Sequence, residues 1–221
     1  MIIAIARRLR RRDEGLGLVE LLVSSLLGLI ILVTAGALMI SATRASNTQA
    51  ISDVNARGAG TAMNAMSRYL HAATTYPTSS GTQPAFSNMG ATDIIFYAYV
   101  NLVSTAAQPV KVHYYVDSTT KNLMEELYSS TCNVTTGYCT FSSTATTIIN
   151  LGGPVASPTS DATALFVYLN AGGAATTVAS AVQSVQVNLE FGSSTAGAAG
   201  NTHLTNTVAL LNIGQFGGTS P

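Results

Sequence analysis

Residues 15–43 read GLGLVELLVSSLLGLIILVTAGALMISAT, and this stretch decides the architecture of the chain. From Leu16 to Thr43 it carries one formal charge, on Glu20, within a run rich in leucine, isoleucine and valine. A helix needs about 20 apolar residues to cross a bilayer, so the stretch predicts a membrane-spanning helix over about residues 16–40. The preceding segment, RRLRRRDEG, is rich in arginine. This basic flank predicts a cytoplasmic N-terminus and an external remainder.

The position of Gly15 distinguishes this layout from an ordinary secretory signal, in which the apolar segment precedes the cleavage site and is removed. Cleavage after Gly15 would leave the helix on the mature chain, with a new α-amino group at Leu16. An unpaired carboxylate in hydrocarbon costs roughly 2.5–3.5 kcal/mol, so Glu20 needs a partner. The new ammonium group of a neighbouring subunit could be that partner. The alternative is an uncut signal anchor with Glu20 near the cytoplasmic interface.

The junction GLGLVELLV resembles the class III leader junction of type IV prepilins and type II secretion pseudopilins. By position, the resemblance implies cleavage after Gly15, N-methylation of Leu16 and a role for Glu20 in registering subunits during filament assembly. Two features depart from the usual pattern. Leu16 replaces the commoner phenylalanine or methionine, and Asp13-Glu14 stand where basic residues are more usual. The resemblance covers only the leader junction and the apolar helix.

The same resemblance implies partners and a location. The partners would be other pilin or pseudopilin subunits, a prepilin peptidase that also methylates, a membrane assembly platform, and membrane lipid before assembly. The precursor would be a single-pass protein of the inner or cytoplasmic membrane with its N-terminus in the cytoplasm. The assembled form would be an extracytoplasmic filament at the cell surface, or one that serves protein secretion. No cofactor is implied.

Charge argues against nucleic acid as the main partner. Beyond residues 1–15, which are expected to be the leader peptide, the chain holds 5 basic and 8 acidic residues, a formal net charge of −3. Binding to phosphate would need a basic patch, which this part of the sequence lacks.

The two cysteines, Cys132 and Cys139, lie in the segment CNVTTGYC. A metal site would need two further ligands, and the nearest histidine, His113, belongs to a different predicted element. Outside the membrane a disulfide that closes a short loop is the favoured interpretation, and no metal site is expected.

The helix is expected to continue beyond the membrane, over residues 16–75 in all, which is roughly 85–90 Å at its rise per residue. Its second half carries a stripe of apolar or small residues spaced three or four apart, which predicts a face packed on the remaining chain. This stripe consists of Ile51, Val54, Gly58, Ala62, Met66 and Leu70. Pro77 marks the boundary to a globular domain over residues 76–221.

After that boundary the pattern changes to aromatic and β-branched segments separated by turns rich in Gly, Ser, Thr and Pro. Strands are predicted over residues 94–100, 110–116, 123–128, 146–151, 164–169, 185–191 and 204–213. Their connections by hairpins and loops predict an antiparallel sheet packed on the helix stripe. The expected fold class is therefore α+β, with the lollipop arrangement of pilins.

A second, more diffuse resemblance concerns the segments VDSTTKNL, VQSVQVNLEF and LTNTVALLNIG, which are similar to W-type minor pilins and J-type minor pseudopilins. It places Asn212 at the asparagine near the end of the last strand, with Leu211 where that family often has arginine. The sequence thus predicts a structural, minor subunit of a type IV pilus or pseudopilus. Two alternatives remain open: an adhesive or DNA-binding module at the tip of such a filament, and a monomeric signal-anchored surface protein.

No catalytic group of residues is recognised, and the chain is not expected to be an enzyme. His71, His113 and His203 have no cysteine, serine motif or carboxylate at the sequence spacing of a triad or a metal site. Adjacent strand residues point to opposite faces, so Glu125 and Glu126 are not expected to share a substrate, and at least one of them is expected to be a solvated charge. The pairs Gly172-Gly173 and Gly217-Gly218 lack a following helix and lysine, which predicts turns and not phosphate sites.

Overall fold

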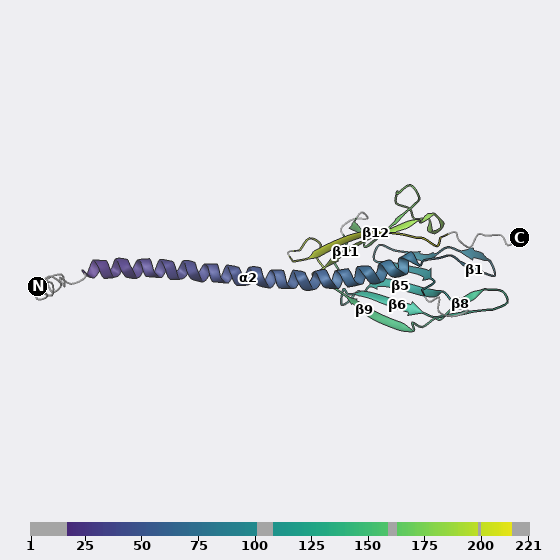
Figure 1. Cartoon of the computed structure of the whole chain (residues 1–221), viewed down its shortest axis with the longest axis horizontal. Coiled ribbons are helices and arrows are strands. Elements are labelled where there is room, and N and C mark those ends of the chain that lie inside the picture. The colour runs from purple at the N-terminus through teal and green to yellow at the C-terminus, as the bar shows by residue number, and fades with distance from the viewer. Residues whose placement is uncertain (1–16, 101–107, 159–162, 199, 214–221) are drawn as a thin grey trace, which may run out of the picture. The chain divides into compact units, whose positions relative to one another are not determined.

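The computed structural model describes residues 17–100, 108–158, 163–198 and 200–213 (Figure 1). The chain divides into two compact units, residues 1–49 and residues 50–221. One long helix, α2 (Leu18–His71), begins in the first unit and ends in the second, and its 54 residues span about 81 Å. Gly15 and Leu16, the predicted cleavage and methylation positions, lie outside the described residues.

The helix ends four residues earlier than predicted because the next backbone groups join strands. The N–H of Thr74 donates to the carbonyl of Tyr97 at 2.8 Å, and Ala73 forms a bridge with Ala98. Thr74 also forms a parallel bridge with Asn212. Asn212, which the second resemblance placed near the end of the last strand, therefore lies beside the end of the helix.

Among the described residues of the second unit, all strand pairs are antiparallel. A five-stranded sheet has the order β3-β4-β5-β6-β9, and a three-stranded sheet has the order β10-β11-β12. Two short ribbons, β1-β2 and β7-β8, complete the unit. The bounds are β1 Tyr76–Thr78, β2 Gly81–Gln83, β3 Phe86–Met89, β4 Asp93–Ala98, β5 Val110–Val116, β6 Leu123–Tyr128, β7 Ser130–Cys132, β8 Cys139–Phe141, β9 Thr147–Gly152, β10 Phe166–Leu169, β11 Ser184–Phe191 and β12 Thr202–Ala209, with a short 3-10 helix, η2, at Ala179–Ala181.

The predicted α+β class is confirmed, with a long helix followed by antiparallel sheets. The expectation of one sheet is corrected, because the strands divide into two principal sheets. The polar connection after β9, which contains Pro154 and Pro158, separates the two sets in the sequence.

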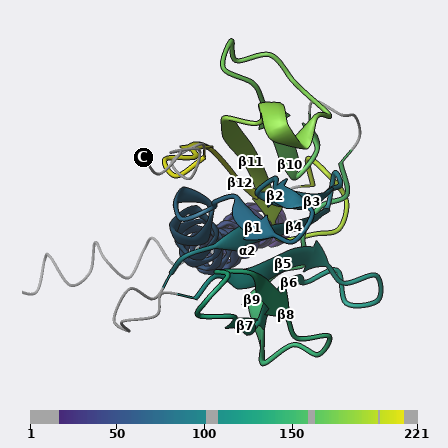
Figure 2. The same ribbon diagram turned by 90° about the vertical axis from the view of Figure 1, so that its right-hand side faces the viewer.

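Both principal sheets contact the part of the helix that belongs to the second unit, and Figure 2 shows this helix end-on between them. On the side of β5, the ring of Tyr114 meets that of Tyr69 edge-on, with centroids 6.5 Å apart. On the side of β12, the Asn206 amide donates to the Ser67 hydroxyl at 3.1 Å. A single hydrophobic core therefore forms from one helix face and both sheets.

The packed helix face differs in part from the predicted stripe. Ala62, Met66 and Leu70 are fully buried as expected, but Ile51 and Val54 are 58% and 69% exposed. Ser52 and Asn55 continue the row of Ala59, Ala62 and Met66 at steps of three or four residues, so they face the rest of the second unit in place of Ile51 and Val54. The Asn55 amide donates to the carbonyl of Gly200 at 3.2 Å, and the Thr202 hydroxyl donates to that of Ser52 at 3.3 Å.

Candidate functional site

The apolar half of α2 is the first candidate site. Every described residue from Gly17 to Ala50 is exposed in this chain, including large side chains such as Leu18 at 78% and Leu32 at 74%. The helix is long and apolar enough to cross a membrane. A surface of this kind needs a membrane or other apolar surfaces to cover it.

Several hydroxyl groups within this surface donate to carbonyl groups of the same helix. Ser25 donates to the carbonyl of Leu22 at 2.9 Å, and Thr34 donates to that of Ile30 at 3.0 Å. Thr43 makes the same kind of bond at 2.9 Å. These hydroxyls therefore need no water, which suits a helix surrounded by lipid or by other helices.

Glu20 is the acidic residue of the first turn of α2. Its backbone N–H donates to the carbonyl of Gly17 at 2.7 Å, and among the described residues no side chain donates to its carboxylate. The helix dipole favours a negative charge at this end, but only by about 0.3–1 kcal/mol. That is less than the cost of placing the charge in hydrocarbon, so a Glu20 located in hydrocarbon would need an external partner.

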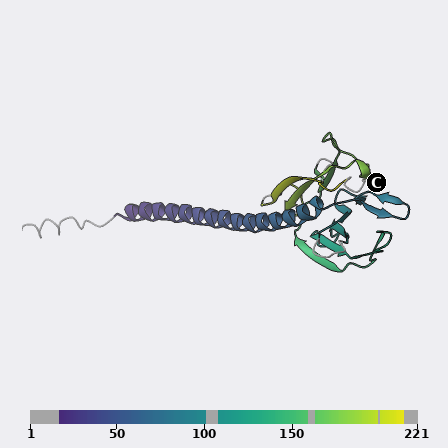
Figure 3. The ribbon, with the colours of Figure 1, turned by 45° about the vertical axis from the view of Figure 1, so that its right-hand side comes forward.

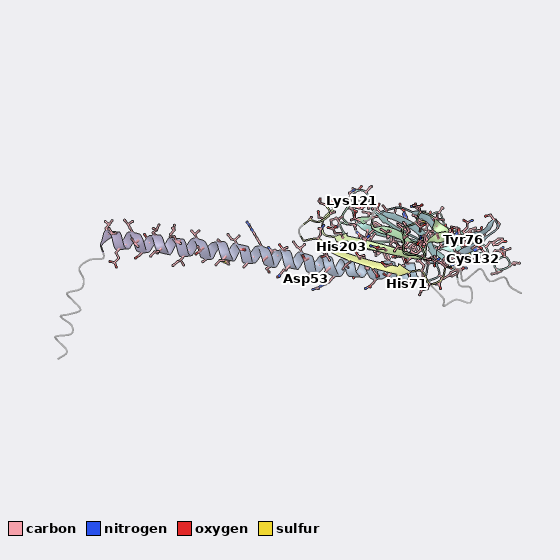
Figure 4. The ribbon with its side chains drawn as sticks, turned by 90° about the horizontal axis from the view of Figure 1, so that it is seen from above. Asp53, His71, Tyr76, Lys121, Cys132 and His203 are labelled. Carbon is pink, nitrogen blue, oxygen red and sulfur yellow. A yellow bond between two sulfur atoms is a disulfide. The ribbon has the colours of Figure 1, made fainter. Side chains whose placement is uncertain are left out.

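The predicted disulfide is confirmed: Cys132 and Cys139 are bonded and join β7 to β8 (Figure 4). The turn they enclose is also held by Asn133, whose side-chain oxygen accepts from the N–H groups of Thr135 at 2.8 Å and Thr136 at 3.1 Å. The disulfide therefore closes a short loop, as the sequence predicted, and this loop joins the two strands of a hairpin.

The cluster around His113 differs from the sequence-based expectation, which found no carboxylate near this histidine. Its Nε2 lies 3.2 Å from Asp93 and its Nδ1 lies 3.2 Å from Glu126. The two carboxylates come from β4 and β6, on either side of β5, and His113 stands directly opposite Glu126. The contact between His113 and Glu126 could have been predicted from the sequence. The two residues are equally distant from the centre of the polar turn over residues 117–122, and such residues stand opposite each other in a hairpin.

Two tyrosines complete this cluster. The hydroxyls of Tyr128 and Tyr115 donate to Glu126 at 2.5 and 3.0 Å. Burial raises the pKa of Glu126, but the hydrogen bonds from Tyr128, Tyr115 and His113 outweigh it and leave that pKa below its usual value. The hydrogen bond to Glu126 raises the pKa of Tyr128 to about 12. Glu126 is therefore held by three groups on β5 and β6, whereas the buried Nε2 of His113, although 3.2 Å from Asp93, has no hydrogen-bond partner among the described residues.

Glu125 lies on the opposite face from Glu126, as predicted, but neither residue is a fully solvated charge. Glu125 is 3% exposed and accepts a hydrogen bond from the Tyr114 hydroxyl at 2.7 Å. The Glu126 side chain is 16% exposed. Burial and the charge of Glu125 together raise the pKa of Tyr114. Tyr114 and Glu125 stand opposite each other in β5 and β6, and what the sequence did not reveal is their burial, which depends on the helix that covers this face of the sheet.

The remaining predicted positions show no shared site. Nδ1 of His71 lies 2.9 Å from the carbonyl oxygen of Ala209, and His203 stands opposite Glu190 between β12 and β11. Gly172 and Gly173 form a turn in which the N–H of Gly172 donates to the Asn170 side chain at 2.9 Å. Gly217 and Gly218 lie outside the described residues.

The described residues offer little to a metal or a small ligand. They contain no group of three or more His, Cys, Asp or Glu side chains able to hold a metal. A cavity of about 550 Å³ opens beside β10, but none of the residues that line it is charged. They are Met89, Gly90, Ala91, Ala164, Phe166, Val167, Tyr168, Ala175, Thr176 and Thr177.

In comparisons with known proteins, the sequence matches no protein-family model, and a search of curated proteins returns no significant match. The fold and the exposed helix therefore carry the functional argument, together with the resemblance of the sequence GLGLVELLV to a prepilin leader junction.

Proposed function

We propose that this chain is a structural, minor subunit of a type IV pilus or of a type II secretion-like pseudopilus. One observation carries the proposal: an apolar helix, exposed from Gly17 to Ala50, has in its first turn an acidic residue for which the described part of the chain offers no partner. A membrane alone would cover the apolar side chains but would leave Glu20 in an unfavourable place. A filament of packed helices supplies both an apolar surrounding and a terminal ammonium.

The mechanism has three steps. The precursor enters the inner membrane with its arginines in the cytoplasm. A membrane peptidase then cuts after Gly15 and methylates the new terminus at Leu16. The helix finally leaves the bilayer for the filament core, where contacts between helices replace contacts with lipid and Glu20 pairs with the terminal ammonium of a neighbouring subunit.

The pairing of Glu20 acts on register more than on overall stability. A buried ion pair contributes little net free energy, because desolvation of both charges offsets their attraction. An unpaired buried charge, in contrast, is strongly unfavourable. A helix that docked out of register would leave Glu20 and the ammonium apart, so the correct register is selected.

The proposal assigns no catalytic role to the chain. In the cluster of His113, Asp93 and Glu126, the Glu126 carboxylate is hydrogen-bonded to His113, Tyr115 and Tyr128, and the cavity beside β10 has no charged lining. The exposed hairpin β7-β8 and the loop before β12 are available for contacts in the assembled filament.

Intact-mass and N-terminal peptide analysis of the protein from its native membrane or shed filaments tests the proposal. The expected chain begins at Leu16, with or without one added methyl group. A Gly15→Leu variant is expected to retain the leader, whereas Gly17→Ala, two residues further on, is expected to be cut normally. A wild-type chain that still carries residues 7–15 would overturn the proposal and favour the plain signal anchor.

A further inference from the structure

The disulfide hairpin β7-β8 lies outside the two principal sheets. Among the described residues, β7 and β8 pair only with each other. Each strand has three residues, and a two-stranded ribbon is marginally stable by itself. In the sequence the hairpin lies between β6 and β9, whose pairing holds its base. β8 contacts β1, and Figure 3 shows both at the same end of the second unit.

Phe141, the last residue of β8, packs on two tyrosines from other elements. Its ring centroid lies 4.7 Å from that of Tyr97 in β4 and 5.2 Å from that of Tyr76 in β1. The centroids of the two tyrosine rings are 4.4 Å apart, so the three rings form one cluster. Tyr76 and Tyr97 are only 8% and 9% exposed. Burial and the hydrogen bond to Tyr97 raise the pKa of Tyr76.

The disulfide lies beside this aromatic cluster. Cys139 precedes Phe141 by two residues in β8, so both side chains point to the same face of the strand. Cys139 is 8% exposed, and Cys132 stands directly opposite it in β7. The hairpin is also attached by a hydrogen bond from the Ser130 hydroxyl to the carbonyl of Pro109. The bond between the two sulfurs therefore fixes the strand that carries Phe141.

We propose that the disulfide is a redox-sensitive switch: while it is closed it keeps Phe141 over Tyr76 and Tyr97, and its reduction opens the hairpin and exposes the two tyrosines. A dithiol would reduce it. The bond between the sulfurs breaks, each sulfur gains a proton, and the dithiol becomes a disulfide. The released loop regains conformational freedom, which favours the open hairpin by up to roughly 50-fold. The pairing of β6 with β9 does not involve the disulfide, so the opening is confined to the hairpin and its aromatic contact.

Nitration of tyrosines in the full chain in detergent tests the proposal. Tetranitromethane attacks accessible phenolate rings, and peptide mass spectrometry gives the nitration rate of each tyrosine. Reduction with dithiothreitol, followed by blocking of the two thiols with iodoacetamide, is expected to raise the rates at Tyr76 and Tyr97 by about tenfold or more. Tyr168 is the matched internal control, because it is 7% exposed but belongs to β10 of the three-stranded sheet. Its rate is expected to stay unchanged.

Three variants separate the disulfide from the ring that it holds in place. Cys132→Ala/Cys139→Ala is expected to be nitrated as the reduced chain is, without reductant or blocking reagent. Phe141→Ala with its disulfide intact is expected to raise both tyrosine rates as well, because the covering ring is missing, and reduction should then add little. Val134→Ala, at a position in the loop of the same hairpin that is 95% exposed, is expected to behave as wild type.

Unchanged nitration of Tyr76 and Tyr97 after reduction would overturn the proposal, because the hairpin would then stay in place without its disulfide. An equal rise at Tyr168 would overturn it too, since reduction would then unfold the whole unit. If Phe141→Ala left both rates as in wild type, Phe141 would not be the covering ring. The switch depends on neither leader cleavage nor filament assembly, and N-terminal peptide analysis measures the cleavage separately, so each proposal can fail alone.

Discussion

At the scale of single residues, the Glu126 carboxylate lies within hydrogen-bonding distance of Tyr128, Tyr115 and His113, at 2.5, 3.0 and 3.2 Å. These contacts hold its pKa below the usual value despite its burial. Glu126→Gln is expected to lower the free energy of unfolding by about 1–2 kcal/mol near neutral pH, because bonds to a charged acceptor are replaced by weaker ones. Unfolding of the full chain in detergent, followed by near-ultraviolet circular dichroism, measures the difference.

The sign of the pH dependence follows from the lowered pKa of Glu126. A carboxylate whose pKa is lower in the folded state stabilises the fold above the pKa of the unfolded chain, and this contribution disappears as the pH falls through the folded-state pKa. The difference in the free energy of unfolding between wild type and Glu126→Gln should therefore become smaller as the pH is lowered. Asp53→Asn, at an exposed helix position (Figure 4), is the matched control and should change little. If the difference in unfolding free energy between wild type and Glu126→Gln stayed constant down to strongly acidic pH, a lowered pKa of Glu126 in the folded state would be contradicted.

Tyr114 gives a second prediction at this scale. Its hydroxyl donates to the buried carboxylate of Glu125 at 2.7 Å. Tyr114→Phe is expected to lower the free energy of unfolding by about 1–3 kcal/mol, since a buried acceptor loses its donor. Tyr138→Phe, on the exposed hairpin, should have almost no effect. The double variant Tyr114→Phe/Glu125→Gln should cost less than the two single changes together, and strict additivity would show that the hydrogen bond is not the cause.

At the scale of secondary-structure elements, the sequence and the structure disagree about one helix face in a way that can be measured. Met66 is fully buried between the sheets, whereas Ile51, on the same predicted stripe, is 58% exposed. Met66→Ala is expected to lower the free energy of unfolding by about 2–5 kcal/mol, because it leaves a cavity. Ile51→Ala should cost no more than about 0.5 kcal/mol. If the two variants lost the same free energy of unfolding, Ile51 would be packed as the sequence predicted, and the structure would be contradicted.

The strands show what sequence patterns can determine. β5, β6 and β11 were predicted to within one or two residues, because alternation and aromatic or β-branched residues are local properties. The short strands β1, β2, β3, β7 and β8 were not predicted, since their polar segments have no alternation to detect. The division into two sheets was also missed. It depends on which strands meet across α2, and periodicity carries no information about such long-range contacts.

The candidate site shows the same limit. The apolar helix, Glu20 and the Cys132–Cys139 disulfide could be read from composition and spacing, because each lies within one short segment. The contact of Asp93 with His113 could not, since it needs the pairing of β4 with β5 across a long connection. The aromatic contact between the hairpin β7-β8 and the rest of the second unit is likewise visible only once the fold is known.

At the scale of the whole molecule, the apolar helix can be covered by membrane lipid alone or by the helices of a filament. The variant Glu20→Gln distinguishes these two cases. Removing the charge makes insertion into hydrocarbon easier by up to roughly 2.5–3.5 kcal/mol, so the level of protein in the membrane should stay equal or rise. In a filament the same change leaves a neighbouring ammonium buried without its partner, which costs about 3–5 kcal/mol. The amount of protein recovered in shed filaments should therefore fall steeply, while Asp53→Asn, further along the same helix, should leave it unchanged. Quantitative immunoblots of membrane and filament fractions measure the level of the protein in the membrane and its amount in shed filaments. If filament yield and register survive Glu20→Gln, the carboxylate does not direct assembly, and an anchor whose glutamate lies at the interface explains the chain better.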